Sequence, residues 1–175
     1  MTEFRLEWSE KCIKEYVDIS VMGKTAAQKI PFIICAGLLG VIFLGGIIMF
    51  AVTGLISSLI ISVCALLFAG VAVLLINLLC KKLAEKVKKA AEGYNDIVAG
   101  VSDNDILFIK NNLPYGVMEW DKIGEITEGK LGFYLISKEG SLLILDKSAV
   151  VSGEVSEAQQ VLGIKAGELH KKDNK

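Results

Sequence analysis

The feature that most constrains this chain is a run of 51 residues, Ile30 to Cys80, that contains no Asp, Glu, Lys, Arg or His. All 39 Lys, Arg, Asp and Glu residues lie in the other 124 positions. As a single helix the run would be about 76 Å long, more than twice the roughly 30 Å of a bilayer's hydrocarbon core. Folded once, near residues 50–54, it gives two arms of the length that a membrane-spanning helix needs. We therefore predict a transmembrane hairpin over residues 30–80, with spans at about 30–50 and 57–79.

Positive charge flanks this run on both sides, and the loop between the two spans carries none. Lys24 and Lys29 precede the first span, and five lysines follow the second. Because positively charged flanks stay in the cytoplasm, we expect a multi-pass protein of the cell membrane with both termini cytoplasmic. The segment after the second span, residues 81–93, is predicted to be a basic juxtamembrane helix that contacts anionic membrane lipid. A topology signal on a solvated helix explains the same charges. The lysines are Lys81, Lys82, Lys86, Lys88 and Lys89.

Small residues recur at four-residue spacing in both predicted spans. They are Ala36 and Gly40 in the first span and Ser62, Ala65 and Ala69 in the second. Such spacing lets helices approach closely within a membrane. These residues are predicted to pack the hairpin against itself, or to form a seam with a second copy or another membrane protein.

The N-terminal segment, residues 1–29, reads as a strand followed by a short helix. Thr2 to Trp8 alternate polar and apolar side chains, which is typical of a half-buried strand. Ser9 stands where a helix N-cap would, and apolar residues then recur at helical spacing. An isolated strand needs a sheet to join, so its partner is expected after the hairpin.

Residues 94–164 are predicted to form a small antiparallel sheet capped by a helix, a pleckstrin-homology-like (PH-like) outline. Turn residues separate short apolar runs, and the helix begins at Ser152 or Gly153 and continues through Leu162, followed by a flexible polar tail, residues 165–175. Because so short a segment makes a thin core, the N-terminal strand is expected to join the same sheet. The fold class is then an α+β membrane protein in which the hairpin interrupts one cytoplasmic domain. The predicted strands are Ile106–Lys110, Val117–Trp120, Gly124–Thr127, Gly132–Ser137 and Leu142–Asp146.

The segments 117–126, 133–136 and 143–150 carry a family resemblance. Together with the order of strand, helix, two spans and basic helix, they resemble the YcxB-like proteins of Gram-positive bacteria. Trp120, Ile123 and the stretch 147–150 match the family pattern, whereas Asp146 and Val150 stand where Pro and Phe are usual. The resemblance implies a PH-like domain and gives no activity to carry over. The structural anchors expected in that domain are Trp120, Ile123, Tyr134 and Val150.

A search for chemistry predicts no catalytic, cofactor-binding or metal-binding residue. The four cysteines lack C-x-x-C spacing, His170 lies in the tail without a partner, and Gly23-Lys24-Thr25 lacks the glycine and the strand of a P-loop. Residues 93–175 carry 9 basic and 13 acidic side chains, which disfavours nucleic acid as a partner.

The function expected from the sequence is therefore non-enzymatic: a membrane-anchored PH-like module that binds or scaffolds a protein partner, a second copy or anionic lipid at the cytoplasmic surface. The alternative is an accessory or immunity-type subunit that regulates a membrane transporter or a membrane-active toxin. Leu113 and Tyr115 flank Pro114 in a predicted turn, which is either an exposed apolar contact, a loop that dips towards the membrane, or an ordinary turn.

Overall fold

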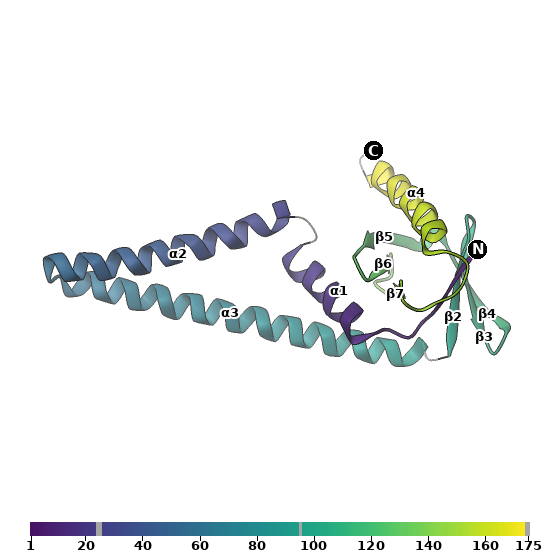
Figure 1. The fold of residues 1–175 in the computed structure, drawn as a ribbon, viewed down its shortest axis with the longest axis horizontal. Coiled ribbons are helices and arrows are strands. Elements are labelled where there is room, and N and C mark those ends of the chain that lie inside the picture. Colours follow the sequence, from purple (N-terminus) through teal and green to yellow (C-terminus); the bar gives the residue numbers. More distant parts are fainter. Residues whose placement is uncertain (24–25, 95, 174–175) are drawn as a thin grey trace. The chain divides into compact units, whose positions relative to one another are not determined.

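A computed structural model describes residues 1–23, 26–94 and 96–173 (Figure 1). Lys24 lies outside the described residues, and so do two of the three residues of the P-loop-like Gly23-Lys24-Thr25. The side chains of Lys29 and His170 also lie outside the description. The chain forms two compact units, one of residues 17–83 and one that combines residues 1–16 with 84–175. We call the first the helical hairpin and the second the sheet domain.

The helical hairpin consists of two apolar helices joined by a tight turn. α2 spans Ala26–Thr53 and α3 begins at Ile56 and ends at Ala91, beyond the hairpin unit. Gly54 between them has a φ of +68°, and its N–H donates to Phe50 O at 2.8 Å. This left-handed residue ends α2 as glycine commonly does, and it lies at the predicted fold point. Among the described residues, these are the two helices long and apolar enough to cross a membrane.

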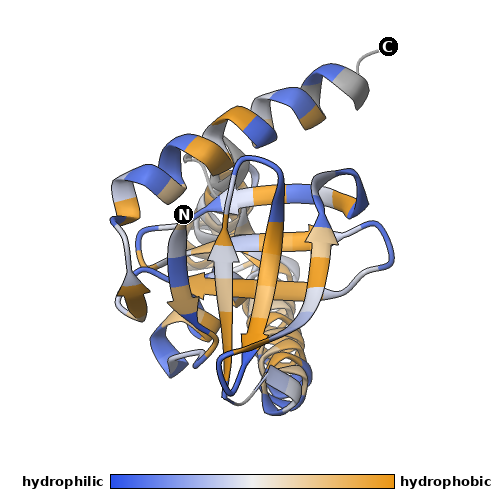
Figure 2. Cartoon of the chain, turned by 90° about the vertical axis from the view of Figure 1, so that its right-hand side faces the viewer, coloured by the Kyte–Doolittle hydropathy of each residue, from blue (hydrophilic) through white to orange (hydrophobic). Residues whose placement is uncertain are grey.

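The sheet domain contains two antiparallel sheets. The larger has the strand order β4-β3-β2-β1-β8 and the smaller β5-β6-β7. A helix, α1, follows β1, and α4, the last described element, packs beside the sheets (Figures 1 and 2). Single 3-10 turns precede β2 and β5. The elements are β1 Thr2–Arg5, α1 Glu10–Met22, η1 Glu92–Tyr94, β2 Ile97–Val101, β3 Asp105–Lys110, β4 Leu113–Glu119, η2 Trp120–Lys122, β5 Ile123–Glu128, β6 Gly132–Ser137, β7 Leu142–Asp146, β8 Val150–Ser152 and α4 Val155–Asp173.

The N-terminal strand joins the larger sheet, as the sequence predicts. β1 lies between β2 and β8, with Arg5 opposite Val98, and the Leu6 N–H donates to Ile97 O at 2.9 Å. The hairpin is therefore inserted between two neighbouring strands of one sheet. The fold class is confirmed as α+β, with two long apolar helices, antiparallel sheets and a C-terminal helix.

The core lies between the two sheets and under α4. Phe4 of β1 and Phe133 of β6 are fully buried and meet edge to face, with ring centroids 6.4 Å apart. Ala158 and Leu162 close the core from α4. Of the predicted anchors, Ile123 and Tyr134 are buried, whereas Trp120 and Val150 are partly buried and pack against the core.

Four segments differ from the sequence prediction. β2 and β8 were not predicted as strands. Residues 113–116 were expected in a turn, but they belong to β4, and the turn is confined to Asn111 and Asn112, whose φ angles of 52° and 59° suit a two-residue hairpin loop. The C-terminal tail was expected from Lys165, yet α4 continues to Asp173, because Leu169 extends its apolar stripe along the core.

Candidate functional site

Polar residues gather where the N-terminus of α1 meets the end of β7. Ser9 Oγ donates to Asp146 Oδ2 at 2.6 Å and accepts the Cys12 N–H at 3.3 Å. Ser9 therefore caps α1, as predicted, and also ties that end of the helix to the sheet. Asp146 Oδ1 accepts the N–H and the Oγ–H of Ser148, at 2.8 and 2.6 Å. Both oxygens of this buried carboxylate thus have partners.

A second carboxylate, Glu15, fastens the next turn of α1. Its oxygens accept the N–H groups of Lys130 and Leu131 at 2.7 and 2.8 Å, and the hydroxyl of Tyr134 at 2.6 Å. The neighbouring Gly129 has no side chain to obstruct this approach, since a Cβ there would lie 2.6 Å from Glu15 Oε2. The loop between β5 and β6 therefore wraps around one carboxylate from α1.

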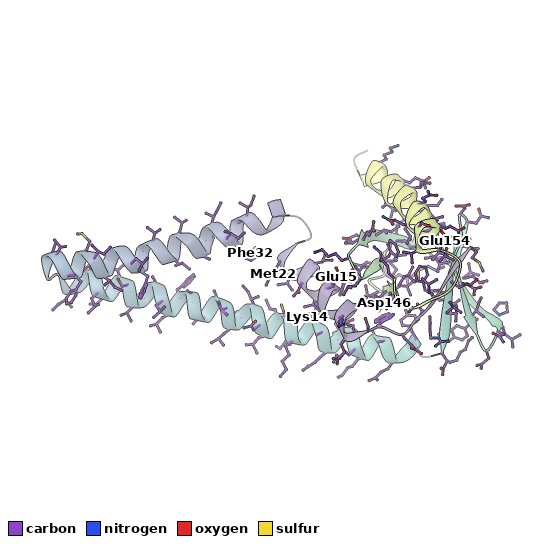
Figure 3. The ribbon with its side chains drawn as sticks, in the orientation of Figure 1. Lys14, Glu15, Met22, Phe32, Asp146 and Glu154 are labelled. Atoms are coloured by element: carbon purple, nitrogen blue, oxygen red, sulfur yellow. The ribbon has the colours of Figure 1, made fainter. Side chains whose placement is uncertain are left out.

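We call Ser9, Cys12, Glu15, Tyr134 and Asp146 the α1 clamp; Figure 3 labels its two carboxylates. Burial alone would raise the pKa of each carboxyl, but the hydrogen bonds that they accept outweigh it, so that both pKa values are lowered and both groups are ionised at neutral pH. Burial raises the pKa of the Cys12 thiol to about 11. Burial, followed by the hydrogen bond to Glu15, raises the pKa of the Tyr134 hydroxyl.

These features indicate that the α1 clamp holds α1 to the sheet by hydrogen bonds and is not a reactive centre. The thiol and the phenol are both protonated at neutral pH, and neither is activated as a nucleophile. The carboxylates are already saturated by donors from the protein. Within the described residues, no group of three or more His, Cys, Asp or Glu side chains is placed to hold a metal ion.

Two hollows border the clamp within the sheet domain. The first, of about 710 Å³, is lined by both signs of charge, including Arg5, Glu7, Lys88 and Glu92, and by Trp8. The Nε1 atom of that tryptophan is buried and has no hydrogen-bond partner in the part of the chain that the structure describes. The mixture of charges gives this hollow no clear preference for an anion or a cation.

The second hollow, of about 750 Å³, lies beside the first turn of α1 and is lined by three lysines and Glu10. Lys147 is held at its edge by Glu128 Oε1 and Gly129 O, at 2.8 and 2.9 Å. Its Nζ also lies 4.6 Å from the centre of the Phe133 ring. The Lys147 side chain therefore stabilises the fold, whereas Lys11 and Lys130 also line the hollow.

The five lysines predicted to contact lipid lie on the C-terminal part of α3, and all five are exposed. Three of them belong to the sheet domain, where Lys88 Nζ lies 2.7 Å from Glu10 Oε1. The hydrogen bond and the charge of Lys88 lower the pKa of Glu10. The basic segment, Lys81–Ala91, is thus a continuous helical stem, as predicted. The lysines of the sheet domain are Lys86, Lys88 and Lys89.

The small residues of the hairpin separate into a packed group and an open group. Ser62 Oγ donates to Phe43 O on the facing helix and to Ser58 O, at 3.1 and 3.0 Å, and Gly46 leaves it room. Towards Ala26, where Figure 1 shows α2 and α3 diverging, an apolar cavity of about 370 Å³ lies between them. Four of the predicted packing residues line this cavity: Ala36, Gly40, Ala65 and Ala69.

Sequence reasoning placed the stem and the small residues but missed the α1 clamp. Its members come from positions 9–15 and 134–146, and no local pattern joins two segments so far apart. One available signal was Asp146, a charged residue that ends an apolar strand. Comparisons of the chain with protein-family models, with curated proteins and with solved structures give no match.

Proposed function

We propose that this protein is a non-enzymatic binding module, held at the cytoplasmic surface of the cell membrane by the hairpin of α2 and α3. The observation that carries the proposal is the position of β1 between β2 and β8. Strands on either side of the hairpin are hydrogen-bonded neighbours, so the chain before α2 and the chain after α3 must lie on the same side of any membrane that these helices cross. Two spans satisfy this condition.

The insertion has a mechanical consequence for binding. The chain leaves the sheet after Arg5 and returns at Ile97, and the Leu6 N–H still donates to Ile97 O. The domain is thereby attached to the membrane at two adjacent points instead of through one flexible linker. Such a tether confines the domain near the bilayer and raises the effective concentration of any weak contact made there.

The cytoplasmic side is supported by the distribution of lysine. The stem after the second span carries five lysines, and the Gly54 turn between the spans is uncharged. Positive flanks favour the cytoplasmic side, and exposed lysines near an anionic surface each contribute up to about 1 kcal/mol of attraction. Anionic lipid is accordingly one ligand class of the proposed module, beside a protein partner or a second copy.

The PH-like architecture and the YcxB-like family are part of this proposal. Two antiparallel sheets with a C-terminal helix packed on the core are consistent with a PH-like outline. Ile123 and Tyr134, two of the positions expected as anchors, are buried. Asp146 departs from the family pattern, but here it has its own role, because its carboxylate receives Ser9 and Ser148.

A cysteine-accessibility experiment tests the placement. Cys35, Cys64 and Cys80 are replaced by Ala, and Asn104, in the turn between β2 and β3, is replaced by Cys. A membrane-impermeant maleimide is expected to label N104C only after cells are permeabilised. Labelling in intact cells would place the sheet domain outside and overturn the proposal. Light scattering and mass spectrometry of the purified full chain then test the binding class, because they show whether a second copy, a protein partner or anionic lipid co-purifies with it.

The second candidate function, an accessory or immunity-type subunit, is favoured by one observation. The apolar cavity between α2 and α3 is lined in part by the small residues Ala36, Gly40, Ala65 and Ala69, and a Cβ on Gly40 would meet nothing within 4 Å. A helix of a transporter or of a toxin could pack there. Under this reading G40L abolishes co-purification of a stoichiometric membrane partner, because Gly40 lines the cavity, while G37L does not, because Gly37 lies outside it. The two changes are matched in the hairpin itself, since a Cβ at either glycine would meet nothing within 4 Å.

A further inference from the structure

The two chain connections to the hairpin and the tip of the β3–β4 hairpin share one end of the larger sheet. Arg5, the last residue of β1, is opposite Val98, and Ile97, the first residue of β2, is opposite Lys110. Lys110 is in turn opposite Leu113, across the Asn111-Asn112 loop. We call this the tether end of the sheet, because the chain departs from it towards both α2 and α3.

The tether end exposes apolar side chains that the fold does not use. Leu113 is 69% exposed and Tyr115 is 67% exposed, and both lie in β4, where the pairing with β3 shifts register between Phe108 and Ile109. Lys110 extends beside them, with its Nζ 5.8 Å from the centre of the Tyr115 ring. A leucine with a tyrosine and a lysine is the combination that suits a membrane interface, where the apolar parts enter the headgroup layer and the ammonium stays in water.

The opposite end of the same sheet has a different character. The β2–β3 turn carries Asp103, and Asp105 is opposite Glu119 at the far end of β4. These acidic residues would be repelled by an anionic bilayer. The tether end is not purely basic, since Glu92 and Asp96 precede β2, so apolar contact rather than net charge has to supply most of the attraction there.

We infer that the tip of the β3–β4 hairpin, through Leu113 and Tyr115, inserts into the headgroup region of the same membrane that its own helices cross. The inference rests on the proposed function, because it presupposes those spans. It gives the sheet domain a third attachment and fixes its rotation about the tether.

Chain length sets a condition for this contact. The stem Lys81–Ala91 is helical, and at about 1.5 Å per residue it would hold the sheet about 16 Å from the end of the uncharged run if it stood along the membrane normal. The tip therefore reaches the headgroups only if the stem is inclined towards the surface. The five exposed lysines on the stem favour that inclination on an anionic bilayer.

Fluorescence depth measurements on the full chain test the inference. In the background without Cys35, Cys64 and Cys80, an environment-sensitive NBD probe is attached at L113C in nanodiscs that contain anionic lipid. Cys12 can remain, because its thiol is buried and its pKa is raised to about 11. We expect blue-shifted emission and several-fold stronger quenching by nitroxide-labelled lipid than for the same probe at N104C, in the acidic turn of the same sheet.

Two further variants make each outcome decisive. A probe at I42C in α2 reports whether the hairpin is in the bilayer: if it is not quenched, the proposed function fails, and if it is quenched while the L113C probe is not, only the present inference fails. Y115S should weaken quenching at L113C, whereas V151S, at an exposed valine of β8, should not. Blue-shifted but unquenched emission at L113C would mean that protein covers the tip, and would overturn the inference.

Discussion

The sheet domain and the helical hairpin are specified in different ways. In the sheet domain, residues from both ends of the chain interlock: Phe4 packs against Phe133, and Glu15 binds Tyr134. In the hairpin, most large side chains are exposed along α2 and α3, and the contact at Ser62 and Gly46 is the best-packed point among those described above. Side-chain complementarity determines the first region, and composition with length determines the second. Single substitutions should therefore act very differently in the two regions.

The largest difference is expected between two phenylalanines. F4A removes a fully buried ring from the strand that joins the two parts of the sheet domain, and it should lower the stability of that domain by about 3–5 kcal/mol. F68A removes a ring that is 68% exposed on α3 and should change it by no more than about 0.5 kcal/mol. Hydrogen exchange of the β2 and β6 amides in the full chain measures both effects. Equal protection in F4A and wild type would show that β1 is not integral to the sheet.

The next effect concerns the α1 clamp and acid. The pKa of Glu15 is lowered from its ordinary value of 4.5 by the hydrogen bonds that it accepts. The stability it contributes is therefore present above about pH 4.5 and is lost as the pH falls through the lowered value. E15Q should cost about 2 kcal/mol at neutral pH, because a charge-assisted acceptor of three donors becomes neutral.

Acid titration of the same amide protection sharpens this test. Wild type should lose protection of the Lys130–Tyr134 segment on acidification, whereas E15Q should lose less, since one of the responsible carboxyls is already absent. D146N is the matched variant at the other carboxylate of the clamp, whose pKa is also lowered. An acid response in E15Q as steep as in wild type would assign the pH dependence to other groups.

A smaller effect is expected at the one tight contact described in the hairpin. A Cβ at Gly46 would collide with Ser62 Oγ and lie 2.7 Å from Ser58 O, whereas one at Gly45 would meet nothing within 4 Å. G46A should thus separate α2 from α3 at a cost of about 1–3 kcal/mol, and G45A should not. The distance between spin labels on the two helices, measured in nanodiscs, distinguishes them. If both variants behave alike, the hairpin is not packed at this point.

Much of this architecture could be predicted because its signals are local. The strands Gly132–Ser137 and Leu142–Asp146 match the prediction residue for residue, since turn sequences bracket them. The fold point of the hairpin was predicted at residues 50–54 because glycine there interrupts an otherwise helical run. The inclusion of the N-terminal strand followed from the size of the core that the remaining residues could form.

The rest depended on distant contacts. β2 contains Ala99 and Gly100, which are poor strand formers, and it is a strand because β1 and β3 pair with it on both sides. Pro114 suggested a turn, but it lies in β4 at an edge of the sheet, where the absence of an N–H is tolerated. The α1 clamp was beyond reach for a similar reason, because hydrogen bonds between residues 119 or more positions apart leave no periodic signal.

The smallest effect is expected from a Glu-to-Gln substitution at Glu10, which lies about one and a half turns before Glu15 on α1. Glu10 accepts a hydrogen bond from Lys88 at 2.7 Å, a geometry as good as that of Glu15, but its side chain is 85% exposed. Water replaces such a partner at almost no cost, so E10Q should leave the amide protection of the sheet domain unchanged where E15Q lowers it. The pair therefore separates burial from hydrogen-bond length as the source of stability. A clear loss of protection in E10Q would mean that the Glu10–Lys88 ion pair stabilises the sheet domain despite its exposure.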